Sequence, residues 1–558
     1  MNVQSQPIAH TQAADDKDWW RGAVIYQIYP RSFQDSNDDG IGDLAGIIHR
    51  LPYIADLGAE AIWISPFFRS PMLDFGYDVS DYCDVDPMFG TLADFDALVT
   101  RAHELGIKVI IDLVLSHTSS IHPWFQESRT SHDNAKSDWF VWADPKPDGT
   151  PPNNWLSIFG GSAWEWDGGR MQYYLHNFLA DQPDLNLHNM EVQDALLDVT
   201  RFWLERGVDG FRLDTVNFYF HDQELRDNPA LSANEIDASI APSVNPYNFQ
   251  DHLYSKSRPE NLDFLKRFRL LLDEYGATTS VGEVGDNERG MEIQGQYTKG
   301  EERLHMCYGF EFLSAPPATG LRVADVIGEA ENVMEGGWAC WSFSNHDVER
   351  HASRWQLSDA AQKVYAGLMM ALKGTVCLYQ GEELGLTEAY VSFEDLQDPY
   401  GKRFWPNFKG RDGCRTPMPW TSDSPYGGFS TAKPWLPVAM EHLSNSVAAQ
   451  CAKENSLHAA YKQLIALRKA HPALQKGSIE MVDIAEGHVS FIREHAGQRI
   501  FCAFNLSDTE LTLSLPAGTW RTDNATPFTA TATEGAVRLP AFQAYFGIAD
   551  DSATPATT

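Results

Sequence analysis

The sequence is poor in positive charge. It has 43 Lys and Arg against 77 Asp and Glu, which gives a formal net charge of −34 over 558 residues. A negative field of this size repels a phosphate backbone and an anionic membrane surface. Nucleic acid and membrane are therefore not expected as partners. The charge does not indicate a fold or a reaction.

Paired cysteines and long apolar runs are also missing. The seven cysteines are scattered and form no Cys-x-x-Cys pair. This pattern excludes a zinc ribbon or a disulfide framework and favours free thiols in a reducing compartment. No basic stretch precedes an apolar run, and no segment reaches membrane-spanning length. We therefore expect a cytoplasmic protein in which residues 1–18 form a flexible N-terminus.

The residues that are present indicate a large folded protein. Aromatic residues make up 12% of the chain and hydrophobic residues 43%. From Ala23 onward, β-branched or aromatic runs alternate with amphipathic stretches, a pattern typical of βα units around a parallel sheet. The predicted strands are 23–33, 60–68, 107–117, 210–216, 278–284, 304–312, 338–347 and 375–383. The predicted helices are 44–57, 92–105, 192–206, 262–275, 323–334, 360–372 and 457–469. The fold class is therefore α/β, a TIM (β/α)8 barrel.

Three segments interrupt this alternation. Residues 118–190 are too many for a loop and are predicted to form a small domain inserted after the third strand. Residues 385–429 form an extended loop subdomain after the eighth strand. From residue 477 to 558 the period changes to two, which predicts a C-terminal antiparallel β domain. The barrel itself then takes up 19–117 and 191–476.

Polar residues gather where several predicted strands end. The third strand ends with His117, the fourth contains Arg212 and Asp214, the fifth ends with Glu283, and the seventh ends with His346 and Asp347. Each could be a buried structural residue or a helix cap. Three carboxylates, an arginine and two histidines at the same end of separate strands instead favour acid and nucleophile chemistry, with donors that grip hydroxyl groups.

These four segments resemble the four sequence regions of the α-amylase family of glycoside hydrolases. Residues 182–186 (Gln-Pro-Asp-Leu-Asn) resemble a fifth region of its oligo-1,6-glucosidase and α-glucosidase subfamily. The resemblance implies that Asp214 is the nucleophile, Glu283 the general acid/base and Asp347 the third carboxylate, which holds substrate hydroxyls. Arg212 beside Asp214 would keep the pKa of that carboxyl low, whereas the acid role needs a raised pKa at Glu283.

The same resemblance implies a substrate pocket for one glucose. Tyr77, Asp78 and Arg411 would close its non-reducing end, and His117 and His346 would bond sugar hydroxyls. Asp78 could instead be a turn residue, and Arg411 a solvated loop charge. Thr215 stands where the α-1,6-specific relatives have valine, which points to maltose-like α-1,4 substrates. Thr215 could also merely suit a strand.

A run of oxygen-bearing side chains lies near the N-terminus. Oxygen ligands at alternate positions suit a hard divalent cation, but Gly46 stands where an EF-hand has its glutamate. The family resemblance implies structural Ca²⁺ or Mg²⁺, and no organic cofactor. The implied ligands are Asp35, Asn37, Asp39, the Ile41 carbonyl and Asp43. The alternative is an acidic turn that caps the next helix.

We therefore expect a retaining, exo-acting α-glucosidase that acts on short α-glucosides and can transfer glucose to other alcohols. An α-1,6- or sucrose-directed relative is a close alternative. A catalytically silent scaffold on the same barrel is the alternative of another class, and the complete set of carboxylates opposes it. The sequence leaves the oligomeric state open.

Overall fold

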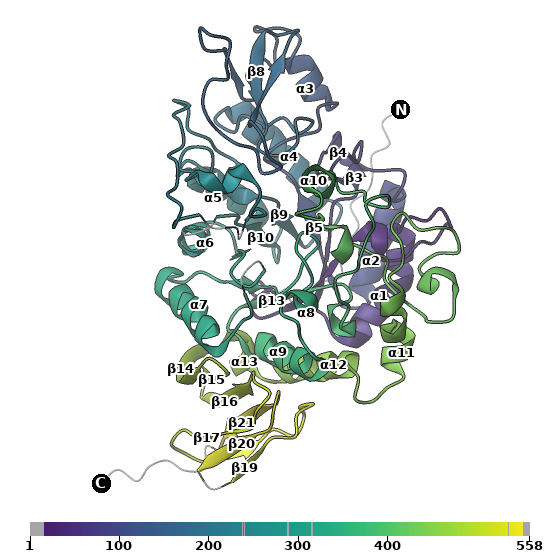
Figure 1. Ribbon diagram of the computed structural model, residues 1–558, viewed down its shortest axis with the longest axis vertical. Helices are drawn as coiled ribbons and strands as arrows, with labels where there is room; N and C mark the ends of the chain where they lie inside the picture. Colours follow the sequence, from purple (N-terminus) through teal and green to yellow (C-terminus); the bar gives the residue numbers. More distant parts are fainter. Residues whose placement is uncertain are drawn as a thin grey trace.

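The computed structural model describes residues 16–236, 238, 240–286, 289–313, 316–533 and 535–550. The molecule is elongated and has three parts along its long axis (Figure 1). The barrel lies in the middle, a small inserted domain at one end, and an antiparallel β domain at the other. Of the predicted N-terminal segment, residues 1–15 lie outside the described residues.

Within the described residues, eight parallel strands form the barrel. In sheet order they are β11 (Met306–Tyr308), β10 (Thr279–Glu283), β9 (Gly210–Leu213), β5 (Lys108–Leu113), β2 (Ala61–Ile64), β1 (Val24–Ile28), β13 (Thr375–Tyr379) and β12 (Cys340–Trp341). A parallel bridge between Cys307 and Ala339 closes the ring. Strands such as β1 and β13 are buried along their whole length, because helices cover the sheet on the outside. The predicted barrel is confirmed.

The barrel helices follow the strands in the expected order. They are α1 (Leu44–Leu57), α2 (Leu92–Glu104), α4 (Met190–Leu204), α5 (Asn261–Asp273), α6 (Gly290–Thr298), α7 (Gly320–Val333), α9 (Asp359–Ala371) and α12 (Leu457–Ala470), with the short α8 (His351–Arg354) before α9. The sequence did not predict α6. This helix contains two glycines, and most of its residues are buried, so it lacks a one-sided apolar stripe.

The inserted domain covers the end of β5. It contains α3 (Pro123–Ser128) and a small antiparallel sheet of β6 (Trp142–Ala143), β8 (Gln172–Leu175) and β7 (Trp164–Asp167). Trp155 is buried in its core and stacks on Trp164. His117 pairs with Asp184 in an isolated bridge, which ties the domain to the barrel directly after β5.

Two loops on the same side of the barrel complete the frame of the site. A hairpin of β3 (Phe68–Arg69) and β4 (Asp81–Val85) follows β2. The long segment after β13 carries α10 (Pro399–Phe404) and, further on, α11 (Val447–Cys451). Both excursions bring side chains from distant parts of the sequence to the barrel strand ends.

The C-terminal domain consists of two antiparallel sheets. After α13 (Pro472–Lys476), the larger sheet has the order β14 (Ser478–Ala485), β15 (His488–His495), β16 (Gln498–Asn505), β21 (Ala544–Ala549) and β18 (Trp520–Thr522). The smaller sheet has the order β17 (Leu511–Ser514), β20 (Ala536–Leu539) and β19 (Thr531–Thr533). A shared core that includes Phe501 and Val537 joins the two sheets.

The described part of the chain contains no helix that is both long enough and apolar enough to span a bilayer. The seven cysteines are all free thiols.

Candidate active site

The carboxylates predicted from the strand ends meet at one cavity of about 140 Å³. Asp214 directly follows β9, Glu283 is the last residue of β10, and Asp347 lies in the loop after β12. The C-terminal ends of parallel barrel strands share one rim, which is why residues so far apart in sequence converge. The cavity lining also includes the predicted residues Tyr77, His117, Thr215 and Arg411.

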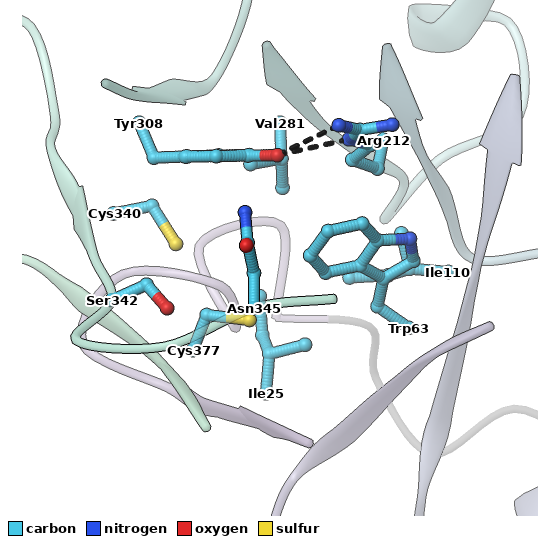
Figure 2. A pocket seen from close by; sticks show the side chains of 10 residues that line it. All are labelled: Ile25, Trp63, Ile110, Arg212, Val281, Tyr308, Cys340, Ser342, Asn345 and Cys377. Atoms are coloured by element: carbon cyan, nitrogen blue, oxygen red, sulfur yellow. Dashed lines mark hydrogen bonds between the residues drawn. The ribbon is translucent and has the colours of Figure 1, made fainter. Parts of the chain in front are cut away.

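Arg212 connects the two central carboxylates. Its Nη1 lies 2.6 Å from Asp214 Oδ1 and 2.8 Å from Asp112 Oδ1, and its Nη2 lies 2.6 Å from Glu283 Oε2. Figure 2 shows that the guanidinium also donates to the Tyr308 hydroxyl, beside a part of the barrel interior lined by side chains such as Trp63. One buried guanidinium therefore fixes Asp214 and Glu283 relative to each other.

The carboxyls that surround Arg212 have raised pKa values in spite of its positive charge. Burial raises the pKa of Glu283 to about 7; Arg212 opposes this shift, and the negative charge of Asp214 adds to it. Burial also raises the pKa of Asp214 to about 7 against the effect of Arg212, with Asp112 and Asp347 adding to the rise. The prediction that Arg212 keeps the pKa of Asp214 low is therefore wrong. Three carboxyls around one guanidinium favour a state in which one of them keeps its proton near neutral pH.

Asp347 has the opposite environment. Its Oδ1 lies 2.8 Å from Arg415 Nη2 and 3.1 Å from Arg411 Nη1, and its Oδ2 lies 3.1 Å from His346 Nε2. Burial alone would raise the pKa of Asp347, but His346, Arg411 and Arg415 hold it well below the usual range. Asp347 therefore stays ionised and can accept hydrogen bonds from sugar hydroxyls.

An ion-pair cluster around Arg411 forms part of the cavity wall. Arg411 Nη2 lies 2.8 Å from Asp74 Oδ1 and 2.8 Å from Asp398 Oδ1. Asp74 and Arg411 both line the cavity. Charge-assisted hydrogen bonds of this kind hold the long side chain of Arg411 in one position.

Asp74, and not the predicted Asp78, faces this cavity. The Asp78 carboxylate accepts hydrogen bonds from Ser70 Oγ and from the backbone amides of Leu73 and Asp74, and it is fully buried. The chain turns at Gly76, where φ is 107°, so residues on the two sides of this glycine point to different places. Asp78 is thus a structural turn residue, as the alternative interpretation of the sequence had it.

The two predicted histidines are neutral and have polar partners in the protein. Burial lowers the pKa of His117 to about 4 and that of His346 to about 3. His346 Nδ1 lies 2.7 Å from Gln27 Nε2, and its Nε2 lies 2.5 Å from the Tyr77 hydroxyl. His346 therefore supports Tyr77 and Asp347, and a contact between either histidine and a sugar hydroxyl stays a prediction.

Thr215 contacts both central carboxylates. Its amide donates to Glu283 Oε2 at 3.0 Å, and its Oγ1 lies 3.2 Å from Asp214 Oδ2. The rest of the cavity wall is largely apolar. It is lined by Ile158, Phe159 and Phe178 of the inserted domain, and by Phe218, Ile240, Phe310 and Val348. The cavity therefore combines a charged part with a part suited to apolar groups.

Five residues that contact the predicted site groups have no role in the sequence-based prediction: Asp74, Asp112, Tyr308, Asp398 and Arg415. Asp112 could have been found, since it is a carboxylate with apolar, buried neighbours on both sides in β5. Arg415 lies only four residues after Arg411 in the same loop. Asp398 gave no signal, because it reaches Arg411 only through the path of the long segment after β13.

The loop that was predicted to bind a metal is held by its own hydrogen bonds. Asp35 accepts from the amides of Asn37, Asp38 and Gly40, and Asp39 accepts from that of Ile41. Asp43 caps α1 through the Gly46 amide. Among the described residues, no three His, Cys, Asp or Glu side chains are placed to hold a metal ion. Asn37 and the Ile41 carbonyl belong to the implied ligand set but not to these residue types, so a metal at this loop stays a prediction.

Comparison with known proteins identifies the family. Residues 27–477 match the α-amylase catalytic domain. The chain belongs to the α-amylase family. It is 62% identical over 535 residues to a probable α-glucosidase of Rhizobium meliloti (strain 1021), covering 95% of this chain and 97% of the relative. It is 37% identical over 550 residues to an oligo-1,6-glucosidase of Heyndrickxia coagulans, covering 90% of this chain and 95% of the relative.

The solved structures agree with this assignment. The crystal structure of an α-glucosyl transfer enzyme, XgtA, has a TM-score of 0.93 with 54% identity and covers 95% of this chain and 99% of its own. The expected family is therefore confirmed. The chain is a glycoside hydrolase of the α-glucosidase and α-glucosyl transfer branch, and these relatives do not decide its linkage preference.

Proposed function

We propose that the protein is a retaining, exo-acting α-glucosidase that releases glucose from the non-reducing end of short α-1,4-glucosides. The observation that carries this proposal is the placement of Asp214 and Glu283 on one guanidinium, beside a cavity that the ion pair of Arg411 and Asp74 lines. A retaining enzyme needs its two carboxyl groups only about 5–5.5 Å apart. The family resemblance implies that Arg411 closes the non-reducing end, which would leave room for a terminal sugar and not for a chain that continues in both directions.

The reaction then proceeds in two displacements. Glu283 gives its proton to the glycosidic oxygen while Asp214 attacks the anomeric carbon, so that the alcohol leaves and a glucosyl ester forms. Glu283, now a carboxylate, takes a proton from water, whose oxygen replaces Asp214 at that carbon. Asp347 stays ionised throughout and accepts hydrogen bonds from glucose hydroxyls.

Two observations support the finer parts of the proposal. Thr215 lines the cavity next to the nucleophile, which supports the α-1,4 preference inferred from the family resemblance. The apolar wall formed by residues such as Phe178 and Phe218 gives an alcohol acceptor a surface to bind, which supports transfer in competition with hydrolysis. Likeness to an α-glucosyl transfer enzyme points the same way.

The test is initial glucose release from maltose, isomaltose and sucrose in parallel, with Asp214→Asn as the blank. We expect maltose to be the fastest substrate and the variant to be inactive on all three. Faster turnover of isomaltose or sucrose would refute the α-1,4 preference. No release from any of the three would refute the proposed activity.

A cytoplasmic location is also proposed, supported by the free state of all seven thiols. Fractionation of the cells that produce the protein tests it, and recovery outside the cytoplasm would refute it.

A further inference from the structure

The residue after the nucleophile has a strained backbone. Thr215 has φ 41° and ψ 46°, in the left-handed region. A β-branched residue seldom occupies this region, and such strain persists only where the surrounding structure imposes it. In this conformation the amide of Thr215 points to Glu283 and its hydroxyl to Asp214. The strain thus places one hydroxyl against the nucleophile.

The Thr215 hydroxyl has a second neighbour. Its Oγ1 lies 3.2 Å from Asp214 Oδ2 and 3.1 Å from Ser116 Oγ. A hydroxyl has one proton, so it can donate to only one of these oxygens at a time. Rotation about the Cβ–Oγ1 bond would move that proton from one acceptor to the other without any proton transfer.

His117 sets the direction of the Ser116 hydroxyl. His117 Nε2 lies 3.0 Å from the Tyr77 carbonyl oxygen, which can only accept, so this nitrogen carries the ring proton. Gln182 Nε2 lies 3.2 Å from the same ring nitrogen and has Asp74 Oδ2 as its acceptor at 3.2 Å. His117 Nδ1 is then an acceptor, and Ser116 Oγ, 2.9 Å away, donates to it. The lone pairs of Ser116 Oγ stay available to Thr215.

We propose that the Thr215 hydroxyl is a two-position donor that follows the charge of the nucleophile. It donates to Asp214 Oδ2 when that carboxylate is charged, and to Ser116 Oγ when Asp214 carries the glucosyl group. Thr215 and Ser116 are positioning residues in this scheme, since they act through Asp214. The inference rests on the proposed function and concerns its second displacement.

The electron balance of the two steps shows which of them the hydroxyl favours. In the first step an electron pair of Asp214 forms the bond to the anomeric carbon, and the carboxylate loses its charge. In the second step water attacks that carbon, Glu283 takes the water proton, and the C–O bond to Asp214 breaks with its electron pair returning to the carboxylate. A donor aimed at Oδ2 stabilises the charged form, and so it favours the second step over the first.

Ser116 gives the Thr215 hydroxyl a second acceptor. When the glucosyl ester forms, Asp214 becomes a weaker acceptor, and the Thr215 hydroxyl would lose its partner without Ser116. Buried polar groups without a partner are costly. The pair of acceptors therefore allows the donor to serve the charged state without destabilising the ester.

The experiment compares Thr215→Val with Thr215→Ser on p-nitrophenyl α-glucoside. Valine has the shape of threonine without the hydroxyl, and serine keeps the hydroxyl. The substrate is the same for each variant, so a change of linkage preference cannot enter the result. For a good leaving group, kcat/KM reports formation of the ester, and kcat reports its breakdown when that step is slower.

For Thr215→Val we expect kcat to fall about 10-fold with KM falling in parallel, so that kcat/KM stays within about threefold of wild type. A stopped-flow burst should approach one p-nitrophenol per active site. Thr215→Ser should recover most of kcat and reduce the burst. This split between kcat and kcat/KM would not arise from a general loss of folded protein, which the burst amplitude and circular dichroism monitor.

Two results would overturn the proposal while leaving the proposed function in place. One is an equal fall of kcat and kcat/KM in Thr215→Val, which would mean that the side chain only shapes the pocket. The other is a valine variant with wild-type kinetics. Absence of turnover by the wild-type enzyme would refute the proposed function, and the two-position donor with it.

Discussion

The two sides of the catalytic cavity differ in how many arginines serve each carboxylate. Asp347 has both Arg411 and Arg415 on one oxygen, whereas Asp214 and Glu283 share Arg212 with Asp112. The three catalytic carboxyls line the same cavity, and yet the pKa of Asp347 is lowered and those of Asp214 and Glu283 are raised to about 7. Because all three carboxyls are buried, the number of arginines around each one separates Asp347, which stays ionised, from Asp214 and Glu283, whose pKa values lie near neutral pH.

The largest effect is expected when the proton donor, Glu283, is removed. Glu283→Gln should lower kcat/KM on maltose by about 10³–10⁴-fold, because the leaving sugar alkoxide needs a proton. On p-nitrophenyl α-glucoside the burst step should lose far less, because p-nitrophenolate leaves without one. Initial rates and stopped-flow traces on both substrates measure this.

Asp214→Asn is the matched control, since it should abolish turnover of both substrates. An equal loss on maltose and on the aryl glucoside in Glu283→Gln would contradict the assignment of Glu283 as the acid.

The two arginines beside Asp347 can be tested separately from the groups around Arg212. Arg415→Met leaves Asp347 with Arg411 alone and removes a charge-assisted hydrogen bond, for which we expect a fall of about 10–100-fold in kcat/KM on maltose. Arg521→Met, which removes an exposed arginine in β18, is the control and should behave as wild type. Unchanged kinetics in Arg415→Met would show that one arginine suffices for Asp347.

The pKa of Glu283 can be changed through Tyr308. The Tyr308 hydroxyl donates to Glu283 Oε1 at 3.1 Å. This hydrogen bond favours the charged form of Glu283, so Tyr308→Phe should raise the pKa of that carboxyl further above about 7. Because Glu283 must be protonated in the free enzyme, the alkaline limb of the kcat/KM profile should move to higher pH, by less than about one unit. A move to lower pH would contradict this sign.

The smallest effect is expected at the loop of residues 35–43. Binding of Ca²⁺ or Mg²⁺ there would have to compete with hydrogen bonds that Asp35 and Asp43 already make. We therefore expect the Tm of chelator-treated protein to rise by only a few degrees on addition of either ion. Asp39→Asn should abolish that rise. No rise with either ion would refute the metal, and the loop would then be a helix cap.

The contrast between Asp214 and Asp347 also shows what sequence reasoning can reach. Strand ends follow from short apolar runs, and so the positions of Asp214 and Glu283 on one rim could be predicted before any coordinates. The number of charges around Asp347 could not be predicted in this way. Arg415 and Asp398 come from a long irregular segment, and its path has no sequence periodicity that would predict it. The pKa of Asp214 was predicted in the wrong direction for another reason: burial, with the charges of Asp112 and Asp347 added to it, outweighs the effect of Arg212.

The sequence also could not show which of Asp74 and Asp78 faces the cavity. Both flank Gly76 within five residues, and either could have faced the substrate. The turn at Gly76 decides between them: its φ of 107° suits glycine, and a Cβ added there would lie 3.0 Å from Pro66 Cβ. Helix α6 was not predicted because its sequence, with two glycines and polar residues such as Gln294 among its buried positions, carries no clear apolar stripe.

The most direct test of the central claim is the anomeric form of the first product. Proton NMR of a maltose digest, recorded before mutarotation, distinguishes α-glucose from β-glucose. Double displacement through Asp214 with Glu283 as acid predicts that α-glucose appears first. Initial release of β-glucose would contradict the account, because a single displacement by water inverts the anomeric carbon.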